Sequence, residues 1–293
     1  NAVVTNVSTD SREVKTGTLF VPIIGERVDA HRFISDVLEA GASCVFFSDD
    51  REKEKKGAGI YVSNTLLAMQ KFAAWYRSKL PVRIIGITGS VGKTTTKEMI
   101  AAVLETKYRT VKTYKNLNSQ IGVALMMFEL DEDTELAVIE MGISMPGEMD
   151  RLVEMVKPEC AVLTNIGVSH IGNLGSRENI LKAKLEILEG MDKKVLVINN
   201  DNDLLNEWNK KEHNDIEIHT YGIENDSDVT AEDIILNEND SEFICNIKGE
   251  KFKVKVPVGG IHFVYNAICA ATIGTLLGLS NEQIKEGIET FEL

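Results

Sequence analysis

The sequence has little cysteine, no surplus of positive charge and no long apolar run. Its cysteines are far apart and none belongs to a C-x-x-C pair: Cys44, Cys160, Cys245 and Cys269. Zinc sites and disulfide frameworks need cysteines at closer and more regular spacing, so we expect neither. Scattered cysteines are typical of a reducing compartment, and we therefore expect a cytoplasmic protein.

The balance of charge is acidic, with 32 lysines and arginines against 45 aspartates and glutamates, a net charge of -13 and a pI of about 5.0. Such a chain repels the phosphates of nucleic acids and anionic lipids, so we expect neither as a partner. No apolar run approaches the roughly 18 residues of a membrane span, and we expect no signal peptide. A bound phosphate compound would need a local pocket of lysine and backbone N–H groups.

The 293 residues are enough for about two domains, and the apolar fraction of 43% is ordinary for a globular protein. Residues 1–80 predict a small α/β domain. Its strands are expected at 18–23, 43–47 and 60–62, its helix at 31–40 and a solvated charge run at 51–56. A connecting helix is predicted at 65–80, and Pro81 then marks the domain boundary.

Residues 81–293 alternate apolar strands with helical segments, which predicts an α/β fold with a mainly parallel sheet. The strands are expected at 83–87, 136–140, 160–163 and 194–198, and the helices at 93–104, 180–188 and 266–279. Four short strands follow after Glu217, at 218–221, 234–236, 243–247 and 252–256. We expect these four to form a small antiparallel patch.

A glycine-rich loop follows the strand at 83–87 and leads into the helix at 93–104. The nucleotide-binding spacing is G-x-x-x-x-G-K-[ST], whereas here five residues separate Gly86 from Gly92 and Ile87 takes the place of the first glycine. A glycine-rich turn without a ligand is the alternative, but the apolar strand and the GKTTT run favour a phosphate site. The predicted nucleotide-binding residues are Gly89, Ser90, Val91, Gly92, Lys93, Thr94 and Thr95.

Within this loop, Lys93 is expected to neutralise the β- and γ-phosphates and Thr94 to offer its hydroxyl to Mg²⁺. Phosphoryl transfer also needs a carboxylate for the metal, and Glu140 ends the strand at 136–140. His170 lies in the loop after the next strand, at the same expected edge. An ordinary strand-end glutamate and an incidental loop histidine are the alternatives.

Two further sets of residues have no decisive pattern. Lys182 and Lys184 lie on the helix at 180–188, where a charged, solvated face is the default explanation. Asn116 and Asn118 could contact phosphate or metal, but on their own they indicate only a turn.

Four stretches together resemble the Mur ligase family of bacterial cell-wall synthesis. They are ITGSVGKTTTKEM, NLNSQIG, VIEMGISMPGEMDRL and VLTNIGVSHIGNLGSRENILKAKLEIL. The stretch STDSREVKTGTLFVPIIGERVDAHRFI is similar to the uridine-nucleotide-binding domain of some members. The resemblance implies two of that family's domains: a UDP-sugar-binding domain at 1–80 and an ATP-binding domain at 81–293. It also implies that the family's C-terminal ligase domain is absent.

The resemblance assigns roles by position. Lys93, His170 and Lys184 match catalytic residues, and Thr94, Glu140, His170 and Lys184 match groups that hold Mg²⁺, with Lys184 carbamylated by CO₂. Asn118 matches an asparagine near the phosphates and Asn266 one that contacts adenine. Ser11, Arg12 and His31 match residues that bind the UDP-sugar. Phe263 departs from the pattern, because the family usually has asparagine there.

The implied reaction is ATP-dependent formation of an amide bond. The MGxxxPGEM stretch most resembles members that join D-Ala-D-Ala to a UDP-N-acetylmuramoyl-tripeptide. The nearest alternative is a member that adds a diamino acid to the UDP-muramoyl-dipeptide, and an enzyme like folylpolyglutamate synthase is a more distant one. A non-catalytic nucleotide-binding fragment is the alternative from another class. We expect a monomer with ATP and Mg²⁺ as cofactors, and little or no ligation by these residues alone.

Overall fold

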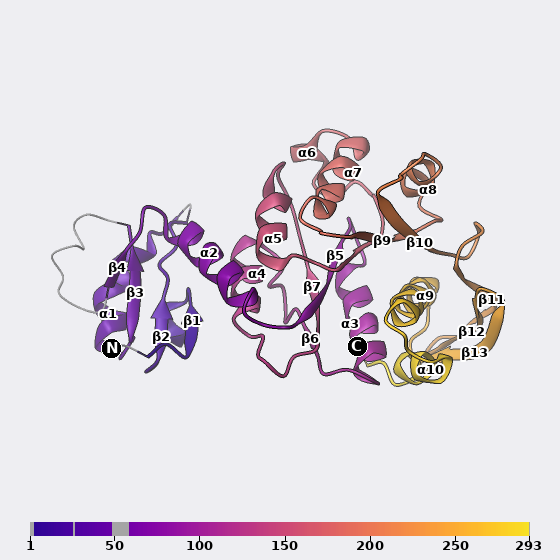
Figure 1. Cartoon of the computed structure of the whole chain (residues 1–293), viewed down its shortest axis with the longest axis horizontal. Helices are drawn as coiled ribbons and strands as arrows, with labels where there is room; N and C mark the ends of the chain where they lie inside the picture. Colours follow the sequence, from indigo (N-terminus) through magenta and orange to yellow (C-terminus); the bar gives the residue numbers. More distant parts are fainter. Residues whose placement is uncertain (1–2, 26, 49–58, 293) are drawn as a thin grey trace.

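The computed structural model describes residues 3–25, 27–48 and 59–292, so the charge run expected at 51–56 lies outside the described residues. The α/β class is confirmed, with a small sheet near the N-terminus and a larger one after it (Figure 1). The small sheet has the order β1-β2-β3-β4 and parallel pairing throughout. Its strands are β1 (Asn6–Ser8), β2 (Thr18–Phe20), β3 (Cys44–Phe47) and β4 (Gly59–Tyr61).

One face of the small sheet packs on the short helical segments η2 (Ala30–Phe33) and α1 (Ile34–Glu39), whereas η1 (Ser11–Glu13) buries no residue. Phe20 and Val45 of the strands meet Ile34 and Val37 of α1 in a small buried cluster. The other face of this sheet contributes Leu19 and further side chains to the main core.

Helix α2 (Thr65–Arg77) connects the two sheets. It begins at the cap Asn64, whose side chain accepts the N–H of Leu67, and it buries Met69 and Ala73. It packs against α4 (Gln120–Met127) and α5 (Glu148–Val156) of the larger unit. The hydroxyl of Tyr76 donates to Leu130 O, which ties the end of α2 to that unit.

The larger sheet has nine strands in the order β13-β12-β11-β10-β9-β8-β5-β7-β6. They are β5 (Arg83–Thr88), β6 (Thr110–Lys112), β7 (Leu136–Glu140), β8 (Cys160–Leu163), β9 (Lys194–Asn199), β10 (Ile216–Gly222), β11 (Val229–Leu236), β12 (Ser241–Ile247) and β13 (Glu250–Val256). Residues alternate along β5, where Ile84 faces one core cluster and Ile85 and Ile87 face the other. Both faces of the sheet are therefore covered.

The antiparallel patch is smaller than the sequence predicted. β10 pairs in parallel with β9 over six residue pairs and with β11 over two, so antiparallel pairing in this sheet is confined to β11 with β12 and β12 with β13. The chain reaches β10 from β9 through helix α8 (Asp203–Asn209), and such a crossover returns the chain in the same direction. Residue alternation shows that a strand exists but not its direction, which is why the sequence assignment of β10 was wrong.

Helices cover the larger sheet on both faces. α3 (Lys93–Glu105), α9 (Ile261–Leu276) and α10 (Asn281–Glu289) pack together on one face. The other face carries α4, α5, α7 (Arg177–Leu185) and η4 (Glu186–Leu188), with α6 (Ile171–Leu174) beside α7. No helix within the described ranges combines the length and the apolar character needed to cross a bilayer.

The two ends of the larger sheet differ in character. β6 forms one end and has only three residues. β13 forms the other, and its exposed lysines pair with acidic side chains: Lys251 with Glu232, Lys253 with Glu242 and Lys255 with Asp240.

Candidate functional site

The glycine-rich loop joins the carboxyl end of β5 to the first turn of α3. Gly89 has φ of +153° and Gly92 has φ of +81°, conformations that side chains rarely adopt. A Cβ on Gly89 would lie 2.0 Å from Thr164 Oγ1. Only glycine fits at position 89, and the loop therefore lies tightly against the chain that follows β8.

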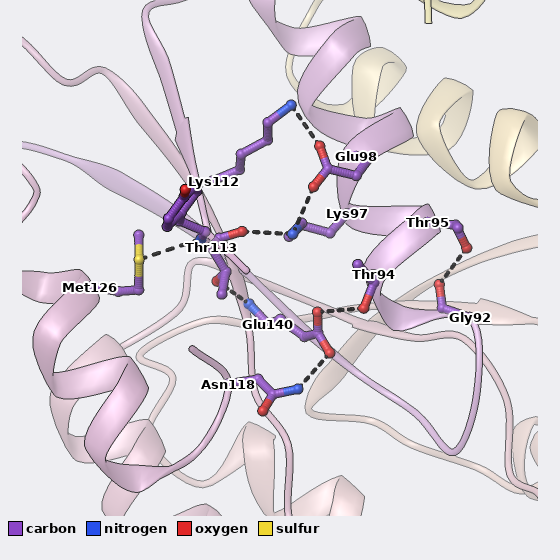
Figure 2. A network of polar contacts seen from close by, with 11 residues as sticks. Gly92, Thr94, Thr95, Lys97, Glu98, Lys112, Thr113, Asn118, Met126 and Glu140 are labelled. Carbon is purple, nitrogen blue, oxygen red and sulfur yellow. Dashed lines mark hydrogen bonds and ion pairs between the residues drawn. The ribbon is translucent and has the colours of Figure 1, made fainter. Parts of the chain in front are cut away.

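Glu140 lies at the same edge, because β7 pairs in parallel with β5 and Glu140 is opposite Ile87. Glu140 is 2% exposed, and its carboxylate accepts two hydrogen bonds. Thr94 Oγ1 donates to Oε2 at 3.0 Å and Asn118 Nδ2 donates to Oε1 at 2.8 Å (Figure 2). The structure thus brings together three side chains that the sequence picked out separately.

Glu140, Thr94 and Asn118 present the oxygen donors that a hard divalent cation prefers. Magnesium is usually held by one or two carboxylates together with phosphate oxygens and water, rather than by a closed cage of protein ligands. Within the described ranges, no group of three or more histidine, cysteine, aspartate or glutamate side chains is placed to hold a metal. The residues fit a magnesium ion that is shared with a bound phosphate.

Two lysines bring positive charge to this site. Lys93 Nζ donates to Gly89 O at 3.0 Å. Burial lowers the pKa of Lys93, and the nearby Glu140 carboxylate partly offsets this effect. Lys184, on α7, is only 3% exposed, and burial followed by repulsion from Lys93 lowers its pKa to about 7. Lys184 is therefore not one of the solvated lysines of a charged helix face.

His170 lies outside the hydrogen-bonded group that Glu140 and Thr94 form, although the sequence placed it beside them. It precedes α6 with a φ of +63° and is exposed. In the part of the chain that the structure describes, no hydrogen bond or ion pair joins its side chain to Glu140 or Thr94. Its role as a metal ligand stays a prediction.

A hollow of about 620 Å³ opens beside the glycine loop and extends to α9. Its lining combines Gly92 and Thr95 of the loop with the aromatic side chains of Tyr221, Phe263 and Tyr265. Asn266 also lines it and accepts a hydrogen bond of 2.9 Å from Thr96 Oγ1. Aromatic faces next to a glycine loop suit a planar base. Contact of Asn266 with adenine stays a prediction.

Sequence reasoning missed Asp201, which also lines this hollow. Its carboxylate accepts the main-chain N–H groups of residues 223, 224 and 225 and the hydroxyl of Tyr265. Burial alone would raise the pKa of Asp201, but these hydrogen bonds lower it overall. Its position just after β9, at the carboxyl edge of the sheet, was the one available signal.

Asn165 was missed as well. Its side-chain Oδ1 accepts the N–H of Ser90 at 3.1 Å and the N–H of Val91 at 2.9 Å. The preceding Thr164 donates from Oγ1 to Val91 O at 2.8 Å. The chain after β8 therefore holds the glycine loop by its N–H groups, the same groups that a phosphate would use.

The expected UDP-sugar residues lie in the small N-terminal unit. Arg12 is exposed, and its guanidinium pairs with Asp10 next to Ser11. His31 is 4% exposed. Its Nδ1 lies 2.7 Å from Asp29 Oδ1, and its Nε2 accepts the N–H of Ser48. Both ring nitrogens of His31 are thus engaged within the chain, and substrate contacts by these three residues stay predictions.

Comparisons with known proteins agree with this arrangement. Residues 87–274 match the Mur ligase middle domain, and residues 3–78 match the Mur ligase family, catalytic domain. The UDP-N-acetylmuramoyl-tripeptide–D-alanyl-D-alanine ligase of Bacillus subtilis (strain 168) is 40% identical over 98% of this chain and 62% of its own length. The chain thus spans less than two thirds of that relative.

Two solved structures are similar over almost the whole chain. MurF from Acinetobacter baumannii has a TM-score of 0.90 at 32% identity, covering 98% of this chain and 63% of its own. MurF ligase from Thermotoga maritima in complex with ADP has a TM-score of 0.88 at 26% identity, covering 98% of this chain and 66% of its own. From the matched domains and the shared architecture, we conclude that the chain belongs to the Mur ligase family.

Proposed function

We propose that this chain is the substrate- and ATP-binding part of a ligase that joins D-Ala-D-Ala to UDP-N-acetylmuramoyl-tripeptide during peptidoglycan precursor synthesis. The observation that carries the proposal is the buried carboxylate of Glu140, bonded to Thr94 and Asn118 beside the glycine loop. The name of the relative that is 40% identical supports this choice of substrates. An ADP complex of a similar structure supports nucleotide binding.

In the proposed reaction, the tripeptide carboxylate attacks the γ-phosphate of ATP, giving an acyl phosphate and ADP. The amine of D-Ala-D-Ala then attacks the acyl carbon, forming the amide and releasing phosphate. A carboxylate is a poor electrophile, so this activation is chemically necessary. Two anions must also meet, and Mg²⁺, when bound, supplies positive charge at the phosphates.

The chain's own residues have distinct tasks in this proposal. The N–H groups of residues 89–95 cradle the phosphates, and Lys93 neutralises their charge. Thr94 and Glu140 hold the magnesium, and Asn118 fixes the second oxygen of Glu140. Asn266 contacts the base from the wall of the hollow. Glu140 contacts both Thr94 of the first turn after the loop and Asn118, and Asn266 lines the hollow beside the loop, which favours a single nucleotide site.

We further propose that Lys184 carries a carbamate. CO₂ adds to the neutral amine, a C–N bond forms and one proton leaves. A pKa of about 7 supports this step, because much of the amine is then neutral near physiological pH. The product is an anion near Lys93. The repulsion between the Lys184 ammonium and Lys93 is thus replaced by attraction between the carbamate and Lys93. As an anion it would join His170 in holding a second Mg²⁺.

Residues 1–80 are proposed to bind the UDP-sugar through Ser11, Arg12 and His31, and residues 81–293 to bind ATP. We propose a monomer. Because the chain spans about 62% of its curated relative, we expect these residues alone to bind nucleotide but to ligate weakly or not at all.

The test uses the product of the complete gene. It would be incubated with ATP, Mg²⁺ and either of two substrate pairs: the tripeptide precursor with D-Ala-D-Ala, or the dipeptide precursor with diaminopimelate or lysine. Mass spectrometry of the ligated product decides between them. We expect product only from the first pair; product only from the second would assign the alternative ligase. ADP release without either product would contradict both.

Lys93→Ala tests the site itself. Loss of a preorganised electrostatic group typically lowers the rate about 10²–10³-fold, and loss of this lysine is expected to abolish turnover. Lys182→Ala is the matched control, because Lys182 is an exposed lysine of α7. Near-normal turnover by Lys93→Ala would contradict the assignment.

A further inference from the structure

The backbone of Glu140 is held by a residue outside the expected site. β6 ends at Lys112, opposite Val138, so the ladder on that side of β7 stops short of Glu140. The chain nevertheless continues the pairing, because the N–H of Thr113 donates to Val138 O at 3.0 Å. The N–H of Glu140 then donates to Thr113 Oγ1 at 2.8 Å. A threonine hydroxyl thus replaces the missing strand partner.

Thr113 is fixed in turn by a buried lysine. Lys97 Nζ donates to Thr113 O at 2.6 Å. Lys97 lies on α3, one turn after Lys93, and both Lys97 and Thr113 are 1% exposed. The same helix therefore carries Thr94, which touches the Glu140 carboxylate, and Lys97, which fixes the residue behind the Glu140 backbone.

The charge of Lys97 is balanced next to it. Lys97 Nζ lies 2.8 Å from Glu98, and Glu98 lies 2.6 Å from Lys112 at the end of β6 (Figure 2). A buried ammonium is costly unless it is paired and hydrogen-bonded, and here it has both a carboxylate and a carbonyl as partners. The pair of lysines around Glu98 also ties α3 to β6, directly beside Thr113.

We propose that Lys97 and Thr113 are positioning residues that hold the backbone of Glu140 so that its carboxylate is aimed at the metal. This inference rests on the magnesium site of the proposed function. Residues that hold a metal ligand typically change metal affinity about 10–100-fold when they are lost. Neither residue contacts the hollow beside the loop, so nucleotide binding without metal should not depend on them.

The experiment measures Mn²⁺ binding to the 293-residue chain in the presence of ADP, by the loss of the free-ion signal in electron paramagnetic resonance. Mn²⁺ prefers the same oxygen ligands as Mg²⁺ and reports on the site without turnover. Thr113→Val removes the hydroxyl and keeps the shape, and it is expected to weaken Mn²⁺ binding about 10-fold. Thr113→Ser keeps the hydroxyl and should stay close to the wild-type value. ADP affinity in EDTA should be unchanged in both.

Thr134→Val is the control for a purely structural effect. Thr134 is also buried and hydrogen-bonded, but it lies before the other end of β7. The inference would be overturned if Thr113→Val and Thr134→Val lost Mn²⁺ affinity equally. It would also be overturned if Thr113→Val lost as much affinity for ADP in EDTA as it lost for Mn²⁺. Lys97→Met gives a second, independent variant in case Thr113→Val does not fold. Lys97→Met should show the same selective loss of Mn²⁺ affinity. If Lys97→Met binds Mn²⁺ as tightly as the wild-type chain, the inference is also overturned.

Glu140→Gln separates this inference from the proposed function. If the wild-type chain with ADP binds Mn²⁺ no better than Glu140→Gln does, the magnesium site itself is wrong and the inference fails with it. If Glu140→Gln weakens Mn²⁺ binding while Thr113→Val and Lys97→Met do not, only the inference fails.

Discussion

Lys184 is buried and lies close enough to the half-buried Lys93 to be repelled by its charge: burial, and then this repulsion, lower the pKa of Lys184 to about 7. An ordinary lysine is almost fully protonated at neutral pH and does not react with CO₂. Lys184 is therefore the lysine of the site best suited to form a carbamate.

The first prediction concerns this carbamate. With ¹³C-labelled bicarbonate, we expect a carbamate signal in the NMR spectrum that is strong at pH 8 and weak at pH 6, because the reactive neutral amine increases as the pH passes about 7. Lys184→Met should remove the signal. Lys182→Met should keep it, since Lys182 is exposed on the same helix. A signal that survives Lys184→Met would refute the assignment.

The second prediction concerns stability in the absence of CO₂. The folded pKa of Lys184 lies below the unfolded value of 10.5, so the unfolded chain binds more protons between these two values. The penalty for burying Lys184 is therefore complete below about pH 7 and disappears as the pH rises towards 10.5. Lys184→Met should stabilise the chain by up to a few kcal/mol at pH 6 and by much less at pH 10. Urea unfolding at both pH values measures this, and a gain that grows with pH would contradict it.

The third prediction concerns Asn165. Its oxygen accepts the N–H groups of Ser90 and Val91 and so fixes the loop before any phosphate arrives. Asn165→Ala should loosen the loop and weaken ADP binding several-fold, equivalent to about 1 kcal/mol for lost hydrogen bonds. Isothermal titration calorimetry measures the change, and Asn179→Ala on α7 serves as the control. Tighter ADP binding by Asn165→Ala would mean instead that Asn165 competes with phosphate.

The fourth prediction concerns Gly89. Alanine there would combine an unfavourable φ with a Cβ 2.0 Å from Thr164 Oγ1. We expect Gly89→Ala to cost about 3 kcal/mol or more of stability and to abolish ADP binding. Gly249→Ala separates the two causes, because Gly249 also has positive φ but nothing lies within 4 Å of its added Cβ. Thermal unfolding should show a distinctly smaller loss for Gly249→Ala; equal losses would rule out the clash.

The part of the site that depends on local pattern was predictable. Lys93 and Thr94 follow from the spacing of the glycine loop, and Glu140 follows from its place at the end of a buried strand. The parallel register of β5 and β7 then brings them together, as the sheet edge predicts.

The remaining contacts depend on segments distant in sequence. Asn165 meets the loop 74 or 75 positions away, and Lys97 meets Thr113 from another element. No sequence motif has a spacing that would predict such pairs. A lysine on a helix, such as Lys97, is ordinarily predicted to be exposed to solvent. The direction of β10 was missed for a related reason, since it depends on the α8 crossover rather than on the strand's own residues.

The ends of the larger sheet have a consequence for how the protein behaves at high concentration. An open sheet can recruit strands from other copies wherever unpaired N–H and C=O groups are exposed. At one end, β6 has only three residues with which a strand of another copy could pair. At the other end, a strand that paired with β13 would have to approach its alternating charged lysines. Both ends thus discourage end-to-end growth into fibres, so the long sheet does not become a template for aggregation.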